Sequence, residues 1–216
     1  SDLRPGERQP VNYFVETQGK QDGMNQAFYA VRECEDDICF TSDRGRIWCY
    51  QKKSGEFRLH ELPTKARITS IHAVGNDNTV VTTDSDGFFL SNLKTNKHIH
   101  YSPVTCKELS DQPILSAYVD RTSEVWFEQE EPGVVVHFNP ATGVVKREQM
   151  RVEYSNADRS RPAFHIHEDI HGHVWVHPYG GGFSYFDRER NCLVPFYDDL
   201  GSNNWRFSNK IHRSEE

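Results

Sequence analysis

Histidine is the residue type whose spacing in this sequence most suggests a chemical site. Residues two apart in a strand share one face, so His165 with His167, and His171 with His173, can each form a pair. A turn separates the two pairs, which disfavours a single zinc site, and strand-face packing with hydrogen bonding is the simpler interpretation. We expect no metal and no cofactor. The cluster occupies thirteen positions and comprises His165, His167, His171, His173 and His177.

Other catalytic signatures are weak. The sequence contains no G-x-S-x-G motif and no P-loop. Acidic residues such as Glu128, Glu130, Glu131 and Asp169 are close together, but 32 aspartates and glutamates place some neighbours by chance. We therefore expect that this chain is not an enzyme.

The five cysteines show neither a C-x-x-C pair nor a metal-ligand spacing. Small buried hydrophobic residues are the simplest interpretation of them. Cys34, Cys39 and Cys49 fall in one predicted structural unit, so a disulfide between strands remains an alternative in an oxidising compartment.

Charge and hydropathy exclude two classes of partner. The net charge is −7, and no run of Lys or Arg forms a basic face, which argues against nucleic-acid binding. No stretch approaches the roughly 18 apolar residues of a membrane span. Membrane anchoring is therefore expected only through parts of a longer parent protein.

The elements that must position these residues repeat four times. Each unit contains an apolar strand, an acidic turn, an aromatic or β-branched strand, a glycine and another apolar strand. The glycines Gly45, Gly87, Gly133 and Gly181 are separated by 42, 46 and 48 residues. A period of about 40 to 50 residues with three or four strands per unit is typical of propeller blades.

The repeat resembles the two-component regulator propeller repeat. The third unit keeps Asp120 and Trp126 but has Ser123 where the turn glycine belongs, and the first two units are more degenerate. The fourth unit matches best, through Asp169-Ile170-His171-Gly172, Val174-Trp175-Val176, Gly181-Gly182-Phe183 and Phe186-Asp187.

These patterns predict an all-β fold, a partial β-propeller of about four four-stranded antiparallel blades plus the first strand of a fifth. The N-terminal segment 1–26 is expected to be the end of a preceding blade or a cap. The predicted blades are 27–66, 67–112, 113–162 and 163–204, and 205–216 begins the fifth. Aromatic residues of the repeated strands are expected in the core between blades, namely Trp48, Trp126, Trp175, Phe138 and Phe186.

One rim of a propeller carries the loops between second and third strands and the connections between blades. Candidate ligand-binding residues on this rim are Tyr179 and Trp205, whose rings suit stacking on sugars, together with His177, Arg161 and His165. Two connections, 102–112 and 148–162, are longer than a plain crossing requires. They indicate either function or surface drift.

The resemblance implies a periplasmic sensor region of a hybrid two-component system histidine kinase, which responds to an oligosaccharide and signals to a kinase outside this chain. Alternative functions are a propeller lyase or hydrolase acting on a polysaccharide and a non-catalytic interaction scaffold. We also expect self-association through uncovered sheet faces of the terminal blades.

Overall fold

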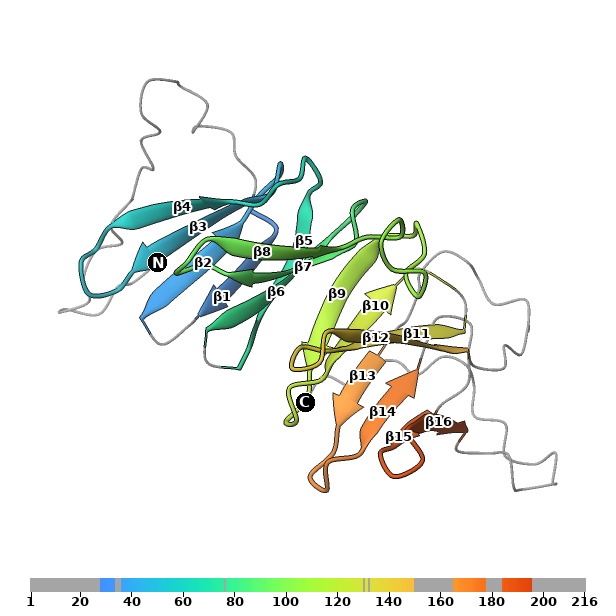
Figure 1. Ribbon diagram of the computed structural model, residues 1–216. Coiled ribbons are helices and arrows are strands. Elements are labelled where there is room, and N and C mark those ends of the chain that lie inside the picture. The colour runs from blue at the N-terminus through green and yellow to red at the C-terminus, as the bar shows by residue number, and fades with distance from the viewer. Residues whose placement is uncertain are drawn as a thin grey trace, which may run out of the picture.

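A computed structural model describes residues 28–33, 36–75, 77–129, 131, 133–149, 165–177 and 184–195. The described residues contain strands, turns and bends but no helix, and therefore no helix long and apolar enough to cross a membrane. Figure 1 shows the strands as four sheets that follow one another in chain order. The all-β fold class predicted from the sequence is confirmed, whereas the predicted fifth blade lies outside the described residues.

Each sheet is one antiparallel blade of four strands that are adjacent in the chain. Blade 1 contains β1 (Ala30–Glu33), β2 (Asp37–Thr41), β3 (Arg46–Gln51) and β4 (Phe57–Glu61). Blade 2 contains β5 (Ile68–Val74), β6 (Asn78–Thr83), β7 (Phe88–Asn92) and β8 (Lys97–Tyr101). Blade 3 contains β9 (Ile114–Val119), β10 (Val125–Gln129), β11 (Val134–Asn139) and β12 (Val144–Gln149). Blade 4 contains β13 (His165–Glu168), β14 (Val174–His177), β15 (Ser184–Asp187) and β16 (Cys192–Pro195).

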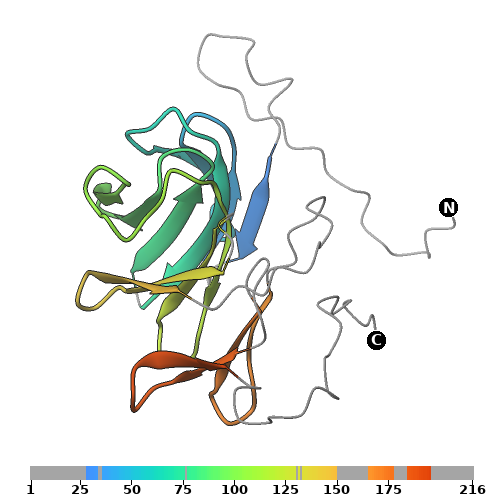
Figure 2. The same ribbon diagram turned by 90° about the vertical axis from the view of Figure 1, so that its right-hand side faces the viewer.

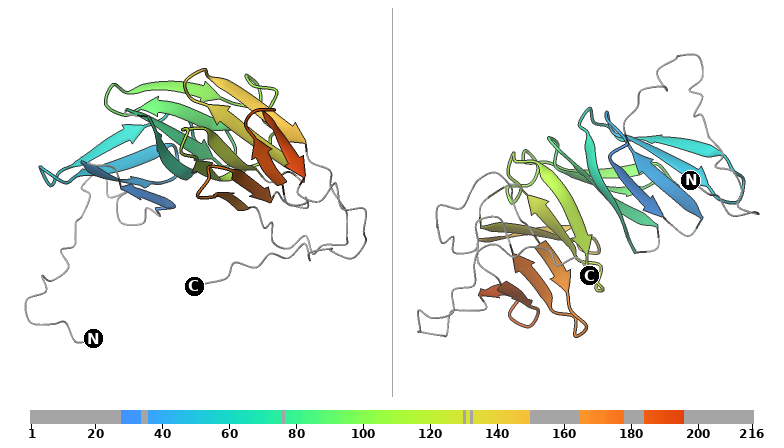
Figure 3. Two further views of the ribbon diagram at one scale, coloured as in Figure 1. Left: turned by 90° about the horizontal axis from the view of Figure 1, so that it is seen from below. Right: turned by 180° about the vertical axis from the view of Figure 1, so that it is seen from behind.

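The blades are arranged along an arc with their first strands on the inner side. Strand β5 contacts both β1 and β9, and Thr69 Oγ1 donates a hydrogen bond to the Ile114 carbonyl oxygen at 2.6 Å. Figure 2 shows the succession from blade 1 in blue to blade 4 in orange and red, and Figure 3 shows it from below and from behind. Inner strands of adjacent blades thus line one wall, as the sequence pattern predicts for a propeller channel.

Strand register gives each blade two apolar faces. One pair of opposed residues on the second and third strands points toward the following blade, and the next pair along points toward the preceding blade. The pairs on the following side are Cys39 with Cys49, Val80 with Leu90, Trp126 with His137, and Trp175 with Tyr185. The pairs on the preceding side are Phe40 with Trp48, Val81 with Phe89, Phe127 with Val136, and Val176 with Ser184.

Three buried clusters fill the three junctions between blades. Cys39 and Ile47 of blade 1 pack with Val81 and Phe89 of blade 2. At the next junction the rings of Phe88 and Phe127 lie 4.5 Å apart. Trp126 of blade 3 meets Phe186 of blade 4 with their ring centroids 4.9 Å apart. Burial of apolar area between sheets is therefore the main force that orders the blades.

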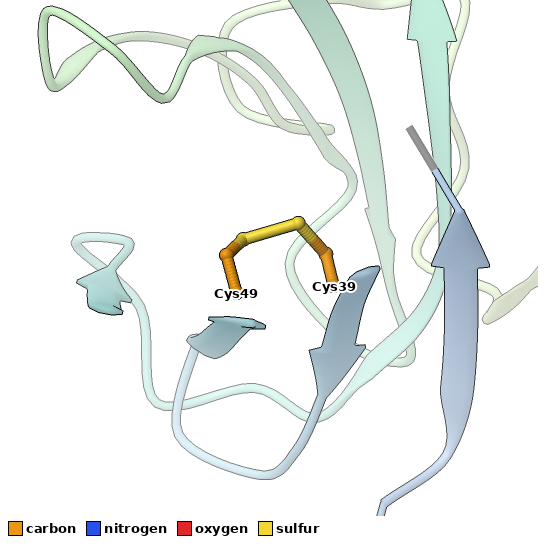
Figure 4. The surroundings of a disulfide bond; sticks show 2 residues. All are labelled: Cys39 and Cys49. Atoms are coloured by element: carbon orange, nitrogen blue, oxygen red, sulfur yellow. A yellow bond between two sulfur atoms is a disulfide. The ribbon is translucent and has the colours of Figure 1, made fainter. Parts of the chain in front are cut away.

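A disulfide joins Cys39 and Cys49 across the β2–β3 pair, as Figure 4 shows. The two residues are direct cross-strand partners with Cα atoms 4.1 Å apart, and each is 2% exposed. The sequence alternative of a strand-to-strand disulfide is realised here. Closing a loop of this short sequence separation contributes about 2 to 3 kcal/mol in the chain-entropy model.

The recurring glycines have a common physical reason. Gly45, Gly87 and Gly133 have φ angles of 66°, 65° and 69°, which favour glycine. A Cβ on Gly45 would lie 3.0 Å from the Leu62 carbonyl oxygen, and one on Gly87 would overlap the Tyr101 carbonyl oxygen. Gly45 and Gly87 therefore let their loops pack closely against the chain segment at the end of the same blade.

The predicted core aromatics occupy different surroundings. Trp126 and Phe138 are fully buried, and Phe186 is 5% exposed; all three lie at junctions between blades. Trp48 is 6% exposed on the face of blade 1 that points away from blade 2. Trp175 is half-buried on the face of blade 4 that points away from blade 3, because its neighbours Val174 and Val176 pack toward blade 3.

We predict that Trp126→Ala lowers the free energy of unfolding by about 3 to 5 kcal/mol, because it removes a buried ring from a junction. Trp175→Ala is the matched comparison, with the same residue type at the equivalent register of a half-buried face, and its loss should be smaller. Urea unfolding of both variants measures this. Equal losses, or an unchanged stability for Trp126→Ala, would contradict the assignment of faces.

Candidate functional site

Loops and connections of blades 1 and 2 share one rim. The Gly45 amide donates to the Ala66 carbonyl oxygen at 3.1 Å, and the Leu62 amide donates to the Gly45 carbonyl oxygen at 2.9 Å. The Asp84 amide donates to the Arg67 carbonyl oxygen at 3.1 Å. The loops 42–45 and 84–87 therefore flank the connection 62–67, and the three segments form one hydrogen-bonded surface.

The structure describes two of the five rim residues proposed from the sequence. His165 begins β13 and His177 ends β14, and they are cross-strand partners at the rim end of blade 4. His177 is only 6% exposed. Tyr179, Arg161 and Trp205 lie outside the described residues, so their role remains a prediction.

The candidate binding residues chosen from the sequence do not include the polar groups of the rim in blades 1 and 2. Asp86 accepts a hydrogen bond from Thr64 Oγ1 at 2.7 Å, and its Oδ1 lies 3.2 Å from His100 Nε2. Asp84 pairs with Arg67, whose guanidinium lies over the Tyr29 ring. Tyr29, Arg67 and Asp84 are far apart in the chain, so only the pairing of blades reveals their proximity.

The histidine-rich segment needs a closer inspection, because His167-Glu168-Asp169-Ile170-His171 has the H-E-x-x-H spacing of zinc peptidases. That motif works on a helix, where residues four apart share a face. Here β13 ends at Glu168 and a turn follows. Glu168 Oε1 lies 2.8 Å from Arg121 Nε in an ion pair. The segment therefore lacks the geometry of a zinc peptidase, and within the described ranges no group of three His, Cys, Asp or Glu residues could hold a metal.

A repeated aspartate organises the hairpins opposite the rim. Trp126 Nε1 donates to Asp120 Oδ2 at 2.9 Å, and Trp175 Nε1 donates to Asp169 Oδ2 at the same distance. The Trp175 hydrogen bond, with others from the His171 and His173 amides, holds the pKa of Asp169 well below its usual range. The Asp and Trp of the repeat thus form a structural unit, six residues apart.

Two arginines clamp blade 3 to blade 4 at the same end. Arg188 Nη2 donates to Asp120 Oδ2 at 3.0 Å, and Arg121 pairs with Glu168. Burial acts to raise the pKa of Asp120, but hydrogen bonds from Thr122, Trp126 and Arg188 outweigh it and lower the pKa. These contacts join the two blades and engage the carboxylates of Asp120 and Glu168.

The long connection 102–112 forms one wall of a shallow groove. Two adjoining depressions of about 480 and 510 Å³ lie between this connection and β12. Lys107, Glu108 and Val145 line both depressions. His177, which is one of the described rim residues, does not line either depression.

Two of the inner strands carry basic side chains with buried nitrogen atoms. Arg32 on β1 and His72 on β5 each carry a buried side-chain nitrogen, Nε and Nε2, without a hydrogen-bond partner among the described residues. Burial, assisted by the positive charge of Arg32, lowers the pKa of His72 to about 4. His72 is therefore neutral at physiological pH.

Comparison with known proteins places this geometry in a fold class. No protein-family model and no curated protein matches the sequence. The extracellular domain of a putative one-component system from B. thetaiotaomicron matches with a TM-score of 0.60 and 14% identity, over 83% of this chain and 23% of that one. The extracellular domain of a putative hybrid two-component system from the same organism matches with a TM-score of 0.59 and 16% identity, over 85% of this chain and 25% of that one.

A similar fold also occurs in an enzyme. Virginiamycin B lyase from Staphylococcus aureus matches with a TM-score of 0.58 and 13% identity, over 81% of this chain and 56% of that one. At such identities the likeness shows the fold alone, which is that of a β-propeller. The chain spans about a quarter of the length of the two sensor domains.

We predict that His72 makes the protein less stable as the pH falls from about 6.5 to about 4. The unfolded chain binds a proton at His72 near pH 6.5, whereas the folded protein binds it only near pH 4. The resulting loss is on the order of 2 to 3 kcal/mol at the acid end of this window.

The measurement is urea unfolding of the parent and of His72→Gln at neutral pH and at the acid end of the window. The variant should lose less stability between the two pH values than the parent does. Identical losses would show that His72 is not held neutral by the fold.

Proposed function

We propose that this chain is the ligand-sensing part of an extracytoplasmic propeller in a hybrid two-component sensor. It binds an oligosaccharide at its rim and passes the signal to a kinase outside this chain. The observation that supports this best is the match of the four blades to extracellular domains of bacterial sensor systems. The sequence signature of the repeat, seen as the Asp120–Trp126 and Asp169–Trp175 units, points the same way.

The disulfide supports a periplasmic location. Disulfides persist in oxidising compartments and are rare in the cytosol. Cys39 and Cys49 form theirs inside a buried cluster, as a part of the junction between blades 1 and 2. The protein is therefore suited to the periplasm, where a sensor region meets its ligand.

The likeness to virginiamycin B lyase raises a second candidate function, that of a propeller lyase or hydrolase, with the polysaccharide substrate that the sequence analysis proposed as the alternative. Such an enzyme needs an acid and a base that converge on one substrate position. The described carboxylates of the repeat are engaged instead: Asp120 and Asp169 hold the indoles, and Glu168 holds Arg121. We therefore favour binding over catalysis.

Calorimetric titration of the 216-residue chain against plant and host oligosaccharides tests this function. We expect one saccharide class to bind and to be recovered uncleaved, and we expect Tyr179→Ala to weaken binding by about 1 to 3 kcal/mol through lost stacking. Cleaved products would establish the lyase alternative. Absence of binding across the panel would favour the scaffold.

We further propose that two copies of the chain associate through the terminal blades. The preceding face of blade 1 carries a cross-strand row of Val31, Phe40, Trp48 and Leu59, in which Val31 is 66% and Leu59 37% exposed. The corresponding faces of the other blades pack against a neighbouring blade. In a second copy, blade 4 carries Trp175 and Tyr185 at the register position that in blades 1 to 3 packs against a neighbouring blade, so such pairing repeats an interface that the fold already uses.

Sedimentation or light scattering over a concentration series measures this association. Val31→Lys should shift the protein toward monomer, because a charge would be buried at the interface. Val144→Lys on β12, where Val144 is 48% exposed, is the matched control and should leave association unchanged. A monomer at every concentration would contradict the proposal.

A further inference from the structure

We propose that Tyr29, Arg67 and Asp84 form a subsite for a neutral sugar residue at the rim between blades 1 and 2. This inference rests on the proposed sensing of an oligosaccharide and assigns a position and a ligand class to it. Tyr29 precedes β1, Arg67 precedes β5 and Asp84 follows β6. All three positions are therefore at strand ends on the rim, beside the inner strands.

The three side chains form one connected group. The Arg67 Cζ atom lies 5.1 Å from the centroid of the Tyr29 ring. Arg67 Nε lies 3.3 Å from Asp84 Oδ2, and the Arg67 amide donates to Asp84 Oδ1 at 3.2 Å. Ser85 Oγ donates to the same Oδ1 at 3.0 Å. The Arg67 guanidinium thus lies between the Asp84 carboxylate and the Tyr29 ring and contacts both.

The backbone makes this arrangement rigid before a ligand arrives. The Tyr29 amide donates to the Thr41 carbonyl oxygen at 3.0 Å, which joins Tyr29 to the end of β2. The Asp84 amide donates to the Arg67 carbonyl oxygen, so the two residues are joined by backbone as well as by side chain. A site built on strand ends loses little conformational entropy when it binds.

The group is accessible and still has hydrogen-bonding capacity. Tyr29 is 47% exposed, and the side chains of Arg67 and Asp84 are 47% and 29% exposed. An aromatic ring suits the apolar C–H face of a sugar, and an arginine beside a carboxylate suits pairs of vicinal hydroxyls. Arg67 contacts Asp84 through Nε, so its terminal nitrogens can donate to hydroxyl oxygens.

Charge balance selects a neutral sugar over an acidic one. The Arg67 guanidinium is already neutralised by Asp84, and Asp86 places a second carboxylate on the same loop. The adjoining loop pairs Asp43 with Arg44 in sequence, which adds no net charge. Lys65 on the connection in turn offsets Asp86, so with Arg67 already paired the subsite carries no excess of positive charge that would select the carboxylate of a uronic acid.

The test is calorimetric titration of the 216-residue chain with neutral oligosaccharides, such as xylo-, manno- and gluco-oligosaccharides, and with oligogalacturonate. We expect a neutral oligosaccharide to bind best. Tyr29→Ala should then weaken binding about tenfold or more, equivalent to about 1.4 kcal/mol or more. Tyr29→Phe keeps the ring and should retain most of the affinity, and Arg67→Ala should weaken binding as well.

Arg58→Ala is the matched control, because Arg58 is an exposed arginine on β4 away from the subsite. Its affinity and melting temperature should equal those of the parent. Thermal unfolding of Tyr29→Ala keeps loss of binding distinct from loss of folding. Full affinity in a folded Tyr29→Ala variant overturns the subsite and leaves the sensing function standing, as does preference for oligogalacturonate. Absence of binding by any oligosaccharide overturns both.

Discussion

The structure depends on the need of each four-stranded sheet to cover two apolar faces. An antiparallel sheet with one face in solvent has a single apolar face. Here, neighbouring residues of one strand, such as Val80 and Val81, point to opposite faces of the sheet and are both fully buried. One blade cannot satisfy this requirement alone. Each blade must stand between two others, which turns the chain into an arc and brings rim loops of successive blades together.

The same register position is filled by different chemistry in each blade. A disulfide occupies it in blade 1, two aliphatic residues in blade 2, a stacked ring pair in blade 3 and a tilted ring pair in blade 4. All of these pairs lie on the side of their blade that points toward the following blade. Blades 3 and 4 add a polar clamp, in which Arg188 and Arg121 reach across the junction. Apolar packing is thus common to all three junctions, and the junction between blades 3 and 4 adds charge pairs to it.

The sequence allowed prediction of what recurs in the chain. The repeat period, the strands around Trp126 and Trp175 and the positions of the recurring glycines follow from local pattern, because each is repeated. The pairing of Cys39 with Cys49 needed the register of β2 and β3, which spacing alone leaves open. The subsite at Tyr29, Arg67 and Asp84 was missed because each residue belongs to a different loop and none stands in a motif. The turn after β13 likewise decides that the H-E-x-x-H spacing is not a zinc site.

The hydrogen bonds between loop 42–45, connection 62–67 and loop 84–87 couple the movements of blades 1 and 2 at the rim. Each loop is the end of a two-stranded hairpin, and the connection 62–67 links the last strand of blade 1 to the first strand of blade 2. A displacement of one loop must therefore pull on the connection and tilt one hairpin against the other. Leverage of this kind converts a small local movement at the rim into a change of angle that grows with distance along the blade.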